Sequence, residues 1–274
     1  MDEKEILFLK EKARHIRKLT IDAIGFLGVG HIGGAMSVVD ILTLLYYKHM
    51  NIDPAQPHKK DRDRLVLSKG HAGPALYSIL ADKGYFPVEW LHTLNKGGTN
   101  LPSHCDMNRT PGIDMTTGSL GQGISTAIGL ALGMRLDIMN NKIYLIIGDG
   151  ESNEGQIWEG AMSAAQFGLS NLIAFTDYNK LQIDGYVNEI MDIEDIAGKW
   201  KAFGWYVQRV DGHDFIAMNE SVELAKKETN RPSMIILDTI KGKGANFAEG
   251  KPESHNMNFS METALDAIKK LDEQ

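Results

Sequence analysis

Two polar side chains stand at matching places along the chain, each directly after a run of apolar residues. Asp149 follows IYLIIG at 143–148, and Asn179 follows NLIAFTDY at 171–178. A carboxylate and a carboxamide are hard oxygen donors of the kind that Mg²⁺ or Ca²⁺ accepts. The glycines on both sides of Asp149 let a bulky anion approach the backbone. The pattern predicts a site for a divalent cation and an anionic ligand.

The GDG turn also fits, in part, an EF-hand loop or a plain strand-to-helix turn. Asp149, Glu151 and Asn153 imitate the start of an EF-hand loop. That match fails, because Glu154 stands where the turn glycine belongs and Gly160 where the bidentate glutamate belongs. A tight strand-to-helix turn capped by Asp149 is the plainer alternative. For GDG alone that alternative is favoured, and the asparagine at the second strand end is the observation against it.

Four of the nine histidines lie in loops rich in glycine, serine or proline. They are His31, His71, His104 and His255, in GVGHIGG, SKGHAG, LPSHCD and PESHNM. A single loop histidine is usually just solvated. Imidazoles that titrate near neutral pH nevertheless suit reactions that move protons on and off oxygen. The four are therefore candidates for acid and base catalysis.

The elements that must position these groups alternate between strands and helices. Apolar or β-branched runs occur at 64–68, 143–147, 171–177, 205–210 and 233–240. Helical patterns separate several of them, at 122–139, 156–168 and 214–228. This alternation predicts an α/β fold, doubly wound, with a mostly parallel sheet and helices on both faces. Ligands bind outside the carboxyl ends of such strands, where Asp149 and Asn179 fall.

The segment GVGHIGGA at 28–35 has the G-x-G-x-x-G spacing of a dinucleotide-binding loop. That fingerprint requires a strand before the glycines. Residues 4–27 instead place apolar side chains at helical spacing, and 36–50 also predicts a helix. Asp53, at the distance of the fingerprint's acid, lies in a loop rich in proline and charge. The glycine spacing is therefore interpreted as a coincidence.

The composition predicts an ordinary globular protein. With 43% hydrophobic and 24% charged residues, the chain is long enough for one large or two small domains. Because it contains no clear linker and no internal repeat, residues 1–274 are expected to form a single domain. The helices at about 4–50 are expected to pack on that domain or on a partner. A net charge of −7 argues against nucleic acid as a partner, since backbone binding needs a basic face.

Cellular context follows from what the sequence lacks. No run approaches the roughly 18 apolar residues of a membrane span, and the mixed, acidic start MDEKEILFLKEK is unlike a signal peptide. We therefore expect a cytoplasmic location and no membrane partner. Cys105 is the only cysteine, so there is no internal disulfide and no cysteine-based zinc site, and it is interpreted as a bystander.

GDGESNEG and FTDYNKLQIDG together resemble the thiamine diphosphate motif of the transketolase family. Further blocks are similar to that family in the same order: GVGHIGGA, LVLSKGHAGPALYSIL, LPSHCDMNRTPGIDMTTGSLGQGISTAIGLALGMRL and DTIKGKGANFAEGKPESHN. The resemblance covers essentially the whole chain, and ordered blocks are far more specific than any single one. It implies the thiamine-diphosphate-binding fold.

The resemblance implies a role for each matching residue. Asp149 and Asn179 become side-chain ligands of Mg²⁺, the main-chain carbonyl of Leu181 completes the protein's share, and Ca²⁺ could substitute. The metal bridges to the diphosphate, which is how an acidic chain holds so anionic a cofactor. The implied contacts to thiamine diphosphate are His71, Gly118, Leu120, Gly150, Glu154, Asn179 and His255.

Several of these contacts have a stated reason. Gly150 and the helix start after it bring backbone amides near the phosphates. At Gly118 the family uses a backbone carbonyl toward the aminopyrimidine, so the glycine matters for access. Glu154 is either the family's glutamate at the subunit contact or a surface acid in a first helical turn, and both remain open. Lys241 and Lys243 lack the spacing of a phosphate loop and are expected to be solvated.

The same resemblance implies ketol transfer, in which protons move on and off sugar oxygens. His31 and His255 would serve the donor's C3 hydroxyl, while His71 and His104 hold its C1 hydroxyl and carbonyl end. His71 could also reach the diphosphate. His255 is followed by Asn256, where the family often has glycine or alanine.

The resemblance ends where the cofactor-binding half of a transketolase ends. Family members continue into a pyrimidine-binding domain, which supplies the glutamate that protonates the aminopyrimidine ring, and into a third domain. We therefore expect a split transketolase in which this chain is the N-terminal subunit. A separate C-terminal subunit would complete a heterotetramer acting on sugar phosphates.

Two alternatives stay open at this point. One is the alpha subunit of a thiamine-dependent 2-oxo acid decarboxylase or dehydrogenase, which shares the GDG-to-asparagine pattern but has no need of four histidines. The other is a cofactor-binding subunit without a catalytic role. Substrate turnover distinguishes the first, and replacement of His31 or His104 distinguishes the second.

Overall fold

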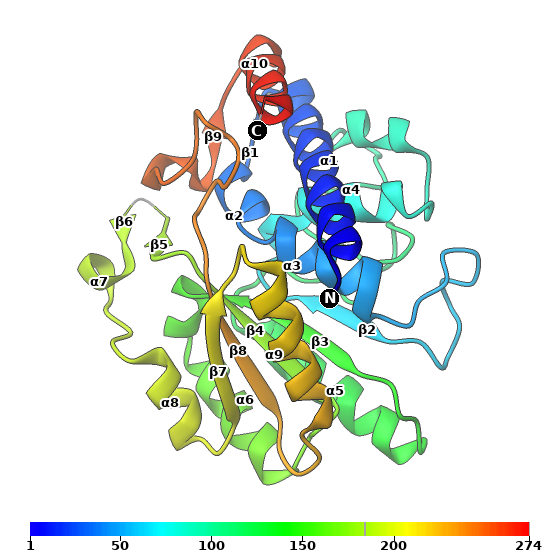
Figure 1. Ribbon diagram of the computed structural model, residues 1–274, viewed down its shortest axis with the longest axis vertical. Helices are drawn as coiled ribbons and strands as arrows, with labels where there is room; N and C mark the ends of the chain where they lie inside the picture. Colours follow the sequence, from blue (N-terminus) through cyan, green and yellow to red (C-terminus); the bar gives the residue numbers. More distant parts are fainter. Residues whose placement is uncertain (184, 274) are drawn as a thin grey trace.

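The computed structural model describes residues 1–183 and 185–273 and is built on a parallel sheet (Figure 1). The strand order is β2-β3-β4-β8-β7, and every pair of neighbours is parallel. The strands are β2 (Arg64–Leu67), β3 (Ile143–Gly148), β4 (Leu172–Tyr178), β7 (Tyr206–Asp211) and β8 (Ser233–Asp238). The predicted parallel α/β sheet is confirmed.

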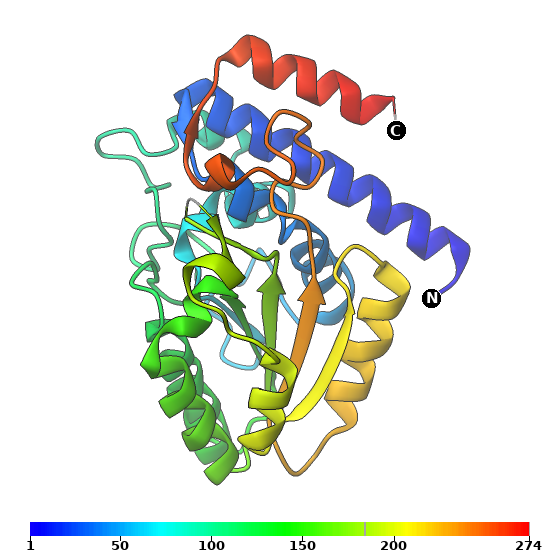
Figure 2. The same cartoon turned by 90° about the vertical axis from the view of Figure 1, so that its left-hand side faces the viewer.

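Helices cover the sheet on both faces. They are α1 (Glu3–Leu27), α2 (Ile32–Met36), α3 (Val39–Leu44), α4 (Gly73–Asp82), α5 (Gln122–Leu136), α6 (Gly155–Gln166), α7 (Val187–Ile190), α8 (Ile196–Ala202), α9 (Phe215–Lys227) and α10 (Met261–Asp272). Figure 2 shows α9, in yellow, and the green helices α5 and α6 on opposite sides of the strands. The predicted double winding is confirmed.

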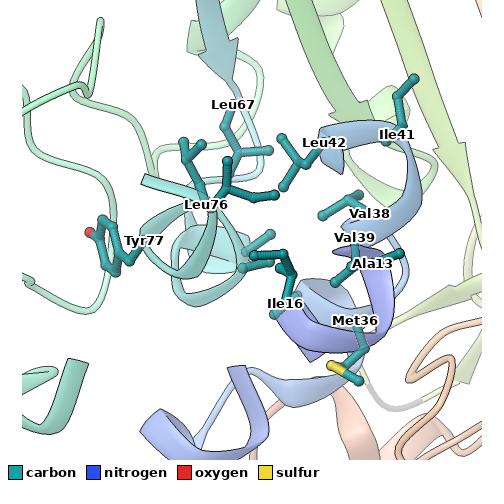
Figure 3. Packing of buried hydrophobic residues seen from close by; sticks show 14 of the residues in the cluster. Ala13, Ile16, Met36, Val38, Val39, Ile41, Leu42, Leu67, Leu76 and Tyr77 are labelled. Carbon is teal, nitrogen blue, oxygen red and sulfur yellow. The ribbon is translucent and has the colours of Figure 1, made fainter. Parts of the chain in front are cut away.

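The core is divided by the sheet because successive side chains of a strand point to opposite faces. Tyr144 and Ile146 join a cluster under α1, α3, α4 and α9. Ile143, Leu145 and Ile147 join a second cluster under α5, α6 and α8. In Figure 3 side chains of α1, α3 and α4 meet beside the end of β2. Strands buried on both faces explain why their sequences are continuous apolar runs.

Helix α1 has clear signals at both ends. Asp2 and Glu5 form a capping box at its start. Gly28 ends it with a φ of +89°, a conformation that favours glycine. The helix packs along α10, and the blue and red helices lie side by side in both ribbon views. None of the described helices is both long and apolar enough to cross a membrane.

The glycine-rich segment joins two helices, as its interpretation required. After α1 the chain forms the two-residue strand β1 (Val29–Gly30) and enters α2. β1 pairs antiparallel with β9 (Met257–Asn258), with Gly30 opposite Met257. No strand of the parallel sheet precedes the glycines within the described chain, and Asp53 lies outside every helix and strand. The pairing brings residues near 30 and near 256 together.

The helix predicted at 36–50 is confirmed over 39–49, but the prediction of one continuous helix is wrong. The helix α2 ends at Met36, α3 follows, and the turns at Leu45–His49 are a π-helix. The interruption lies at Ser37, whose hydroxyl donates to the carboxylate of Asp177 at 2.7 Å. A tertiary hydrogen bond, which leaves no mark in the periodicity, accompanies the break.

Other elements carry weak sequence signals and were not predicted. α8 has seven residues and α10 follows a loop near the chain's end, while β5 (Leu181–Gln182) and β6 (Gly185–Tyr186) form a minimal antiparallel pair. The helices predicted at 122–139, 156–168 and 214–228 correspond to α5, α6 and α9 with small shifts at their ends.

Candidate active site

Asp149 and Asn179 lie at neighbouring strand ends. β3 and β4 run in register with Gly148 opposite Asp177, so the residues that follow emerge together. Asp149 accepts hydrogen bonds from the backbone N–H of Gly150 at 2.8 Å and of Lys180 at 2.5 Å. The backbone of one strand end thus holds the carboxylate of the other, as parallel pairing predicts.

Asp149 is buried and its pKa is raised to about 7. Burial is the main cause, and the nearby charge of Asp177 adds to it. A divalent cation would remove this penalty by pairing with the ionised carboxylate. The side-chain oxygen of Asn179 and the carbonyl of Leu181 add two further hard donors, which suits Mg²⁺ or Ca²⁺. The donor set therefore fits the implied metal.

Asp177 is a buried charge that sequence reasoning passed over. Its carboxylate accepts from the hydroxyls of Ser37 (2.7 Å) and Thr239 (2.5 Å), from the Lys69 ammonium, and from the Asn179 side-chain amide (3.0 Å). Burial pushes the pKa of Asp177 up, but the Lys69 charge and the hydrogen bonds hold it below its ordinary value. The contact with Asn179 fixes which amide atom faces away from Asp177.

Glu151 is a second buried carboxylate, and it joins three segments. It accepts from the Ser68 hydroxyl after β2, from Gly121 N–H at the start of α5 (2.9 Å), and from Gly148 N–H at the end of β3 (3.0 Å). In the sequence, only the partial EF-hand match drew attention to this residue. Its hydrogen bonds hold these three segments together at the edge of the cleft.

A cleft of about 720 Å³, counting its open mouth, lies over these strand ends. It is lined by Gly34, Lys69, His71, Leu120, Gly148, Asp149, Gly150, Glu151, Asn153, Glu154, Asn179, Leu181, Gln182, Ile183, Lys241 and His255. A volume of this order is typical of small-molecule and cofactor sites. Eight of the residues proposed from the sequence are among them.

Three observations test whether the cleft fits a diphosphate. The side-chain nitrogen of Gln182 is buried without a hydrogen-bond partner within the described residues, so it has a donor to offer. A Cβ on Gly150 would lie 2.6 Å from the Cβ of Gln182, so the glycine keeps the approach open. The Lys69 and Lys241 ammonium groups add positive charge. Donors and cations together suit an anion.

The expectation that Lys241 is solvated is wrong. Its side chain is buried, and its ammonium lies 3.5 Å from the carbonyl oxygen of Leu181. Lys243 is partly exposed and pairs with Glu249 at 3.3 Å, which agrees with the expectation for that residue. The backbone N–H of Gly242 donates to the carbonyl of Gly33 and holds this loop against the segment at 33. No local sequence pattern predicts that contact.

The four loop histidines come together. Between ring centroids, His31 lies 5.4 Å from His71, 5.7 Å from His104 and 5.4 Å from His255. His71 lies 5.1 Å from His255. His71 and His255 line the cleft, and His31 stands behind them. These four rings, from four separate segments, are called the histidine wall below.

Burial lowers the pKa of every imidazole in the histidine wall. The pKa of His71 falls well below its ordinary value, and that of His255 falls to about 4, with Lys241 as the second cause. The pKa values of His31 and His104 are lowered as well, again mainly by burial. The sequence-based expectation of titration near neutrality is therefore wrong, because it left out desolvation. At pH 7 these rings are neutral and able to accept protons.

The remaining predicted residues border the cofactor cleft in different ways. Leu120 and Glu154 are exposed at the mouth of the cleft, with Glu154 just before α6. Gly118 has a φ of +142°, and a Cβ there would lie 2.9 Å from the His104 ring. A side chain at 118 would therefore press on the histidine wall. Cys105 is buried, and burial raises the pKa of its thiol to about 12, which fits a bystander.

The fold and motifs together match a known family. A family model described as the transketolase thiamine diphosphate binding domain matches residues 9–271. The chain belongs to the transketolase family. Both the family and the fold predicted from the sequence are thereby confirmed.

Relatives of similar length are named as subunits. The chain is 58% identical over 274 residues to 6-deoxy-6-sulfo-D-fructose transketolase subunit SqwG of Clostridium sp. (strain MSTE9), covering 99% of that protein. It is 38% identical over 266 residues to an apulose-4-phosphate transketolase subunit of Actinobacillus succinogenes, covering 95% of this chain and 96% of that protein. The chain is accordingly a transferase subunit of the transketolase type.

Solved transketolases share the fold but are longer. Transketolase from Campylobacter jejuni superposes with a TM-score of 0.90 at 32% identity, covering 99% of this chain and 43% of that one. Transketolase from Leishmania mexicana superposes with a TM-score of 0.91 at 29% identity, covering 96% and 41%. The chain therefore spans about two fifths of these transketolases.

Proposed function

We propose that this chain is the diphosphate-binding subunit of a split transketolase. With thiamine diphosphate and Mg²⁺ it transfers a two-carbon ketol unit from a ketose donor to an aldose acceptor. Residues 1–274 form one diphosphate-binding domain, and a separate C-terminal subunit supplies the rest of each site in a cytoplasmic heterotetramer. The support is that relatives covered almost end to end are named as subunits, whereas single-chain transketolases are more than twice as long.

The observation that carries the proposal is the histidine wall beside the strand-end oxygens. His71 and His255 line the cleft beside Asp149 and Asn179, and the ring centroid of His31 lies 5.4 Å from each of them and 5.7 Å from that of His104. Ketol transfer needs protons to move at a carbonyl and at a neighbouring hydroxyl. Decarboxylation of a 2-oxo acid does not require proton transfer at a neighbouring hydroxyl group. The wall therefore favours ketol transfer over the alternatives.

Each residue has a defined task in this proposal. Asp149, Asn179 and the Leu181 carbonyl hold Mg²⁺, and Lys241 adds charge beside the diphosphate. When bound, thiamine diphosphate supplies the nucleophilic carbon that attacks the ketose carbonyl. The histidine wall orients the sugar and carries protons. His31 and His255 act at the C3 hydroxyl, and their lowered pKa values keep them in the form that accepts a proton.

His71 and His104 hold the C1 hydroxyl and the carbonyl end of the donor. Gly118, Leu120, Gly150 and Glu154 complete the contacts to the cofactor. The donor we propose is 6-deoxy-6-sulfo-D-fructose, because the relative named for that sugar is 58% identical and the one named for apulose-4-phosphate is 38% identical. Ketose phosphates are the competing donors.

The test is turnover by the purified chain, alone and with its C-terminal subunit, with thiamine diphosphate and Mg²⁺ in both assays. The donors are 6-deoxy-6-sulfo-D-fructose, fructose 6-phosphate, apulose 4-phosphate and pyruvate, a 2-oxo acid without a hydroxyl group. We expect ketol transfer only from the complex, fastest with the sulfo sugar. Strong transfer by the chain without its C-terminal subunit would refute the proposal. Turnover of the 2-oxo acid, with no turnover of any sugar donor, would refute it as well.

A further inference from the structure

A second hollow lies on the other side of His31. It encloses about 470 Å³, counting its mouth, and is lined by Leu27, Val29, Gly30, His31, Pro74, Leu94, Asn95, Ser103 and Asn256. His31 lines this hollow and not the cofactor cleft, yet its ring lies within 5.7 Å of the other three histidines. One imidazole thus stands between the two spaces. We call this hollow the outer pocket.

The outer pocket is lined by apolar groups and by uncharged polar groups. Leu27, Val29, Pro74 and Leu94 supply apolar surface. Asn95, Ser103 and Asn256 supply two amides and a hydroxyl, each of which can both donate and accept. Within residues 1–183 and 185–273, no lysine, arginine or carboxylate lines the outer pocket. Carbohydrate has the matching character, since C–H faces pack on apolar groups and hydroxyls pair with amides.

The fold fixes two of the polar groups relative to the histidine wall. The β1–β9 pairing places Gly30 opposite Met257, so His31 and Asn256 leave the pairing at the same level. Asn256 itself has extended backbone, with φ −148° and ψ 111°. Ser103 precedes His104, and Asn256 follows His255. Two of the polar groups are therefore sequence neighbours of wall histidines.

Asn95 is held in a turn at the rim of the outer pocket. Its φ is +53°, a left-handed conformation that asparagine tolerates better than most residues, and its N–H donates to the Leu101 carbonyl at 2.9 Å. The next residue, Lys96, holds its ammonium over the Phe26 ring at 4.5 Å and does not line the pocket. An amide, and no cation, is thus presented at this rim.

We propose that the outer pocket receives the uncharged hydroxylated carbons of the ketose donor beyond the bond that breaks, and that Asn95 and Asn256 set the specificity for that chain. The proposal rests on the proposed function. The phosphate or sulfonate at the end of the sugar is bound outside this pocket, since none of the described residues that line it is charged. Asn95 and Asn256 form hydrogen bonds with hydroxyl groups of the sugar and do not contact the reacting carbonyl.

The test compares two donors in the complete complex with its C-terminal subunit, thiamine diphosphate and Mg²⁺. The long donor is the ketohexose derivative that the wild-type complex uses best. The short donor is hydroxypyruvate, in which the bond between the carboxylate C1 and the carbonyl C2 breaks to release CO₂ and leave the same two-carbon unit, and which has no chain to enter the outer pocket. The measured quantity is the ratio of kcat/KM for the long donor to that for the short donor.

The variants are chosen to keep the backbone intact. Asn95→Gly removes the amide at a position whose positive φ suits glycine, and Asn256→Ala removes the other amide from extended backbone. We expect the double variant to lower the ratio at least tenfold, through a higher KM for the long donor. Asn108→Ala, which removes an exposed amide outside the pocket, is expected to leave the ratio unchanged.

Each outcome decides the matter. An equal loss with both donors would mean that the asparagines only support the histidine wall, and an unchanged ratio would mean that the sugar chain lies elsewhere. Either result overturns the proposal. If the wild-type complex turns over neither donor, the proposed function fails before the specificity is tested.

Discussion

The strand-end oxygens and the histidine wall share one site but are built differently. The carboxylates of Asp149, Glu151 and Asp177 each accept at least two hydrogen bonds and are locked in place. The four imidazoles have no side-chain hydrogen bond among the described residues and are held by ring contacts. We call the three carboxylates and Asn179, at the strand ends, the floor of the site; their positions are fixed by hydrogen bonds. The loops carry the histidine wall, whose ring nitrogens are still able to donate or accept hydrogen bonds. A fixed floor suits a resident ion, and a wall with free hydrogen-bonding capacity suits a changing substrate.

The sharpest way to break the floor is to remove its metal-binding carboxylate. For Asp149→Ala we expect Mg²⁺-dependent binding of thiamine diphosphate to be lost, by more than about 100-fold, because even outer partners of a metal site contribute about 10- to 100-fold. Isothermal titration calorimetry measures this. Asp137→Ala removes an exposed carboxyl after α5 and serves as the control. Unchanged affinity in Asp149→Ala would refute the ligand assignment.

The wall should respond differently. In His31→Ala we expect turnover of the complex to fall about 10²- to 10⁴-fold, since an acid–base group is lost. The calorimetric affinity for thiamine diphosphate should stay within about twofold, because His31 does not line the cofactor cleft. His58→Ala, at an exposed loop histidine, controls for the substitution. If His31→Ala lowered the affinity for thiamine diphosphate as much as it lowered turnover, His31 would belong to the cofactor site and the proposed difference between floor and wall would be wrong.

A smaller loss of metal affinity is expected when the residue that orients a ligand is changed: Asp177 orients the metal ligand Asn179. Asp177→Asn should weaken Mg²⁺-dependent binding about 10- to 100-fold, acting through Asn179. Calorimetry on a double-mutant cycle with Asn179→Ala should then show strongly non-additive losses. Additive losses would mean that Asp177 does not act through the amide.

Stability provides the matched control for that variant. Asp177→Asn leaves the buried Lys69 ammonium without its anion and should cost roughly 3–5 kcal/mol of unfolding free energy. Adding Lys69→Met should recover much of this loss in urea denaturation but not the metal affinity. Recovery of both would show that only folding was affected.

The last expected effect is a pH dependence of metal binding at Asp149, which needs no substitution. The raised pKa of Asp149, about 7, means that a proton occupies the carboxyl below that pH and must leave before the cation binds. Apparent Mg²⁺ affinity should thus fall about tenfold per pH unit below 7 and level off above it. Titrations between pH 5.5 and 8.5 measure this, and a flat profile would contradict the raised pKa.

Much of the floor could be predicted from the sequence. Asp149 and Asn179 each follow a buried strand, and parallel strands present their carboxyl ends at one edge. Glu151 and Asp177 escaped prediction because a buried acid looks like any other acid until its partners are known. Lys241 was misjudged for the same reason, since a lysine in a glycine-rich loop is normally solvated.

By itself, the sequence determined the alternation of strands and helices, the family, and the residue types at the site, because these depend on local periodicity and on motifs of adjacent residues. Only the tertiary structure shows the contact by which His31 and His255 meet, since the β1–β9 pairing joins segments far apart in the chain. It also decided that the histidines are neutral and that Lys241 is buried. Burial and desolvation are sums over the whole packed chain, and no short stretch of residues contains them.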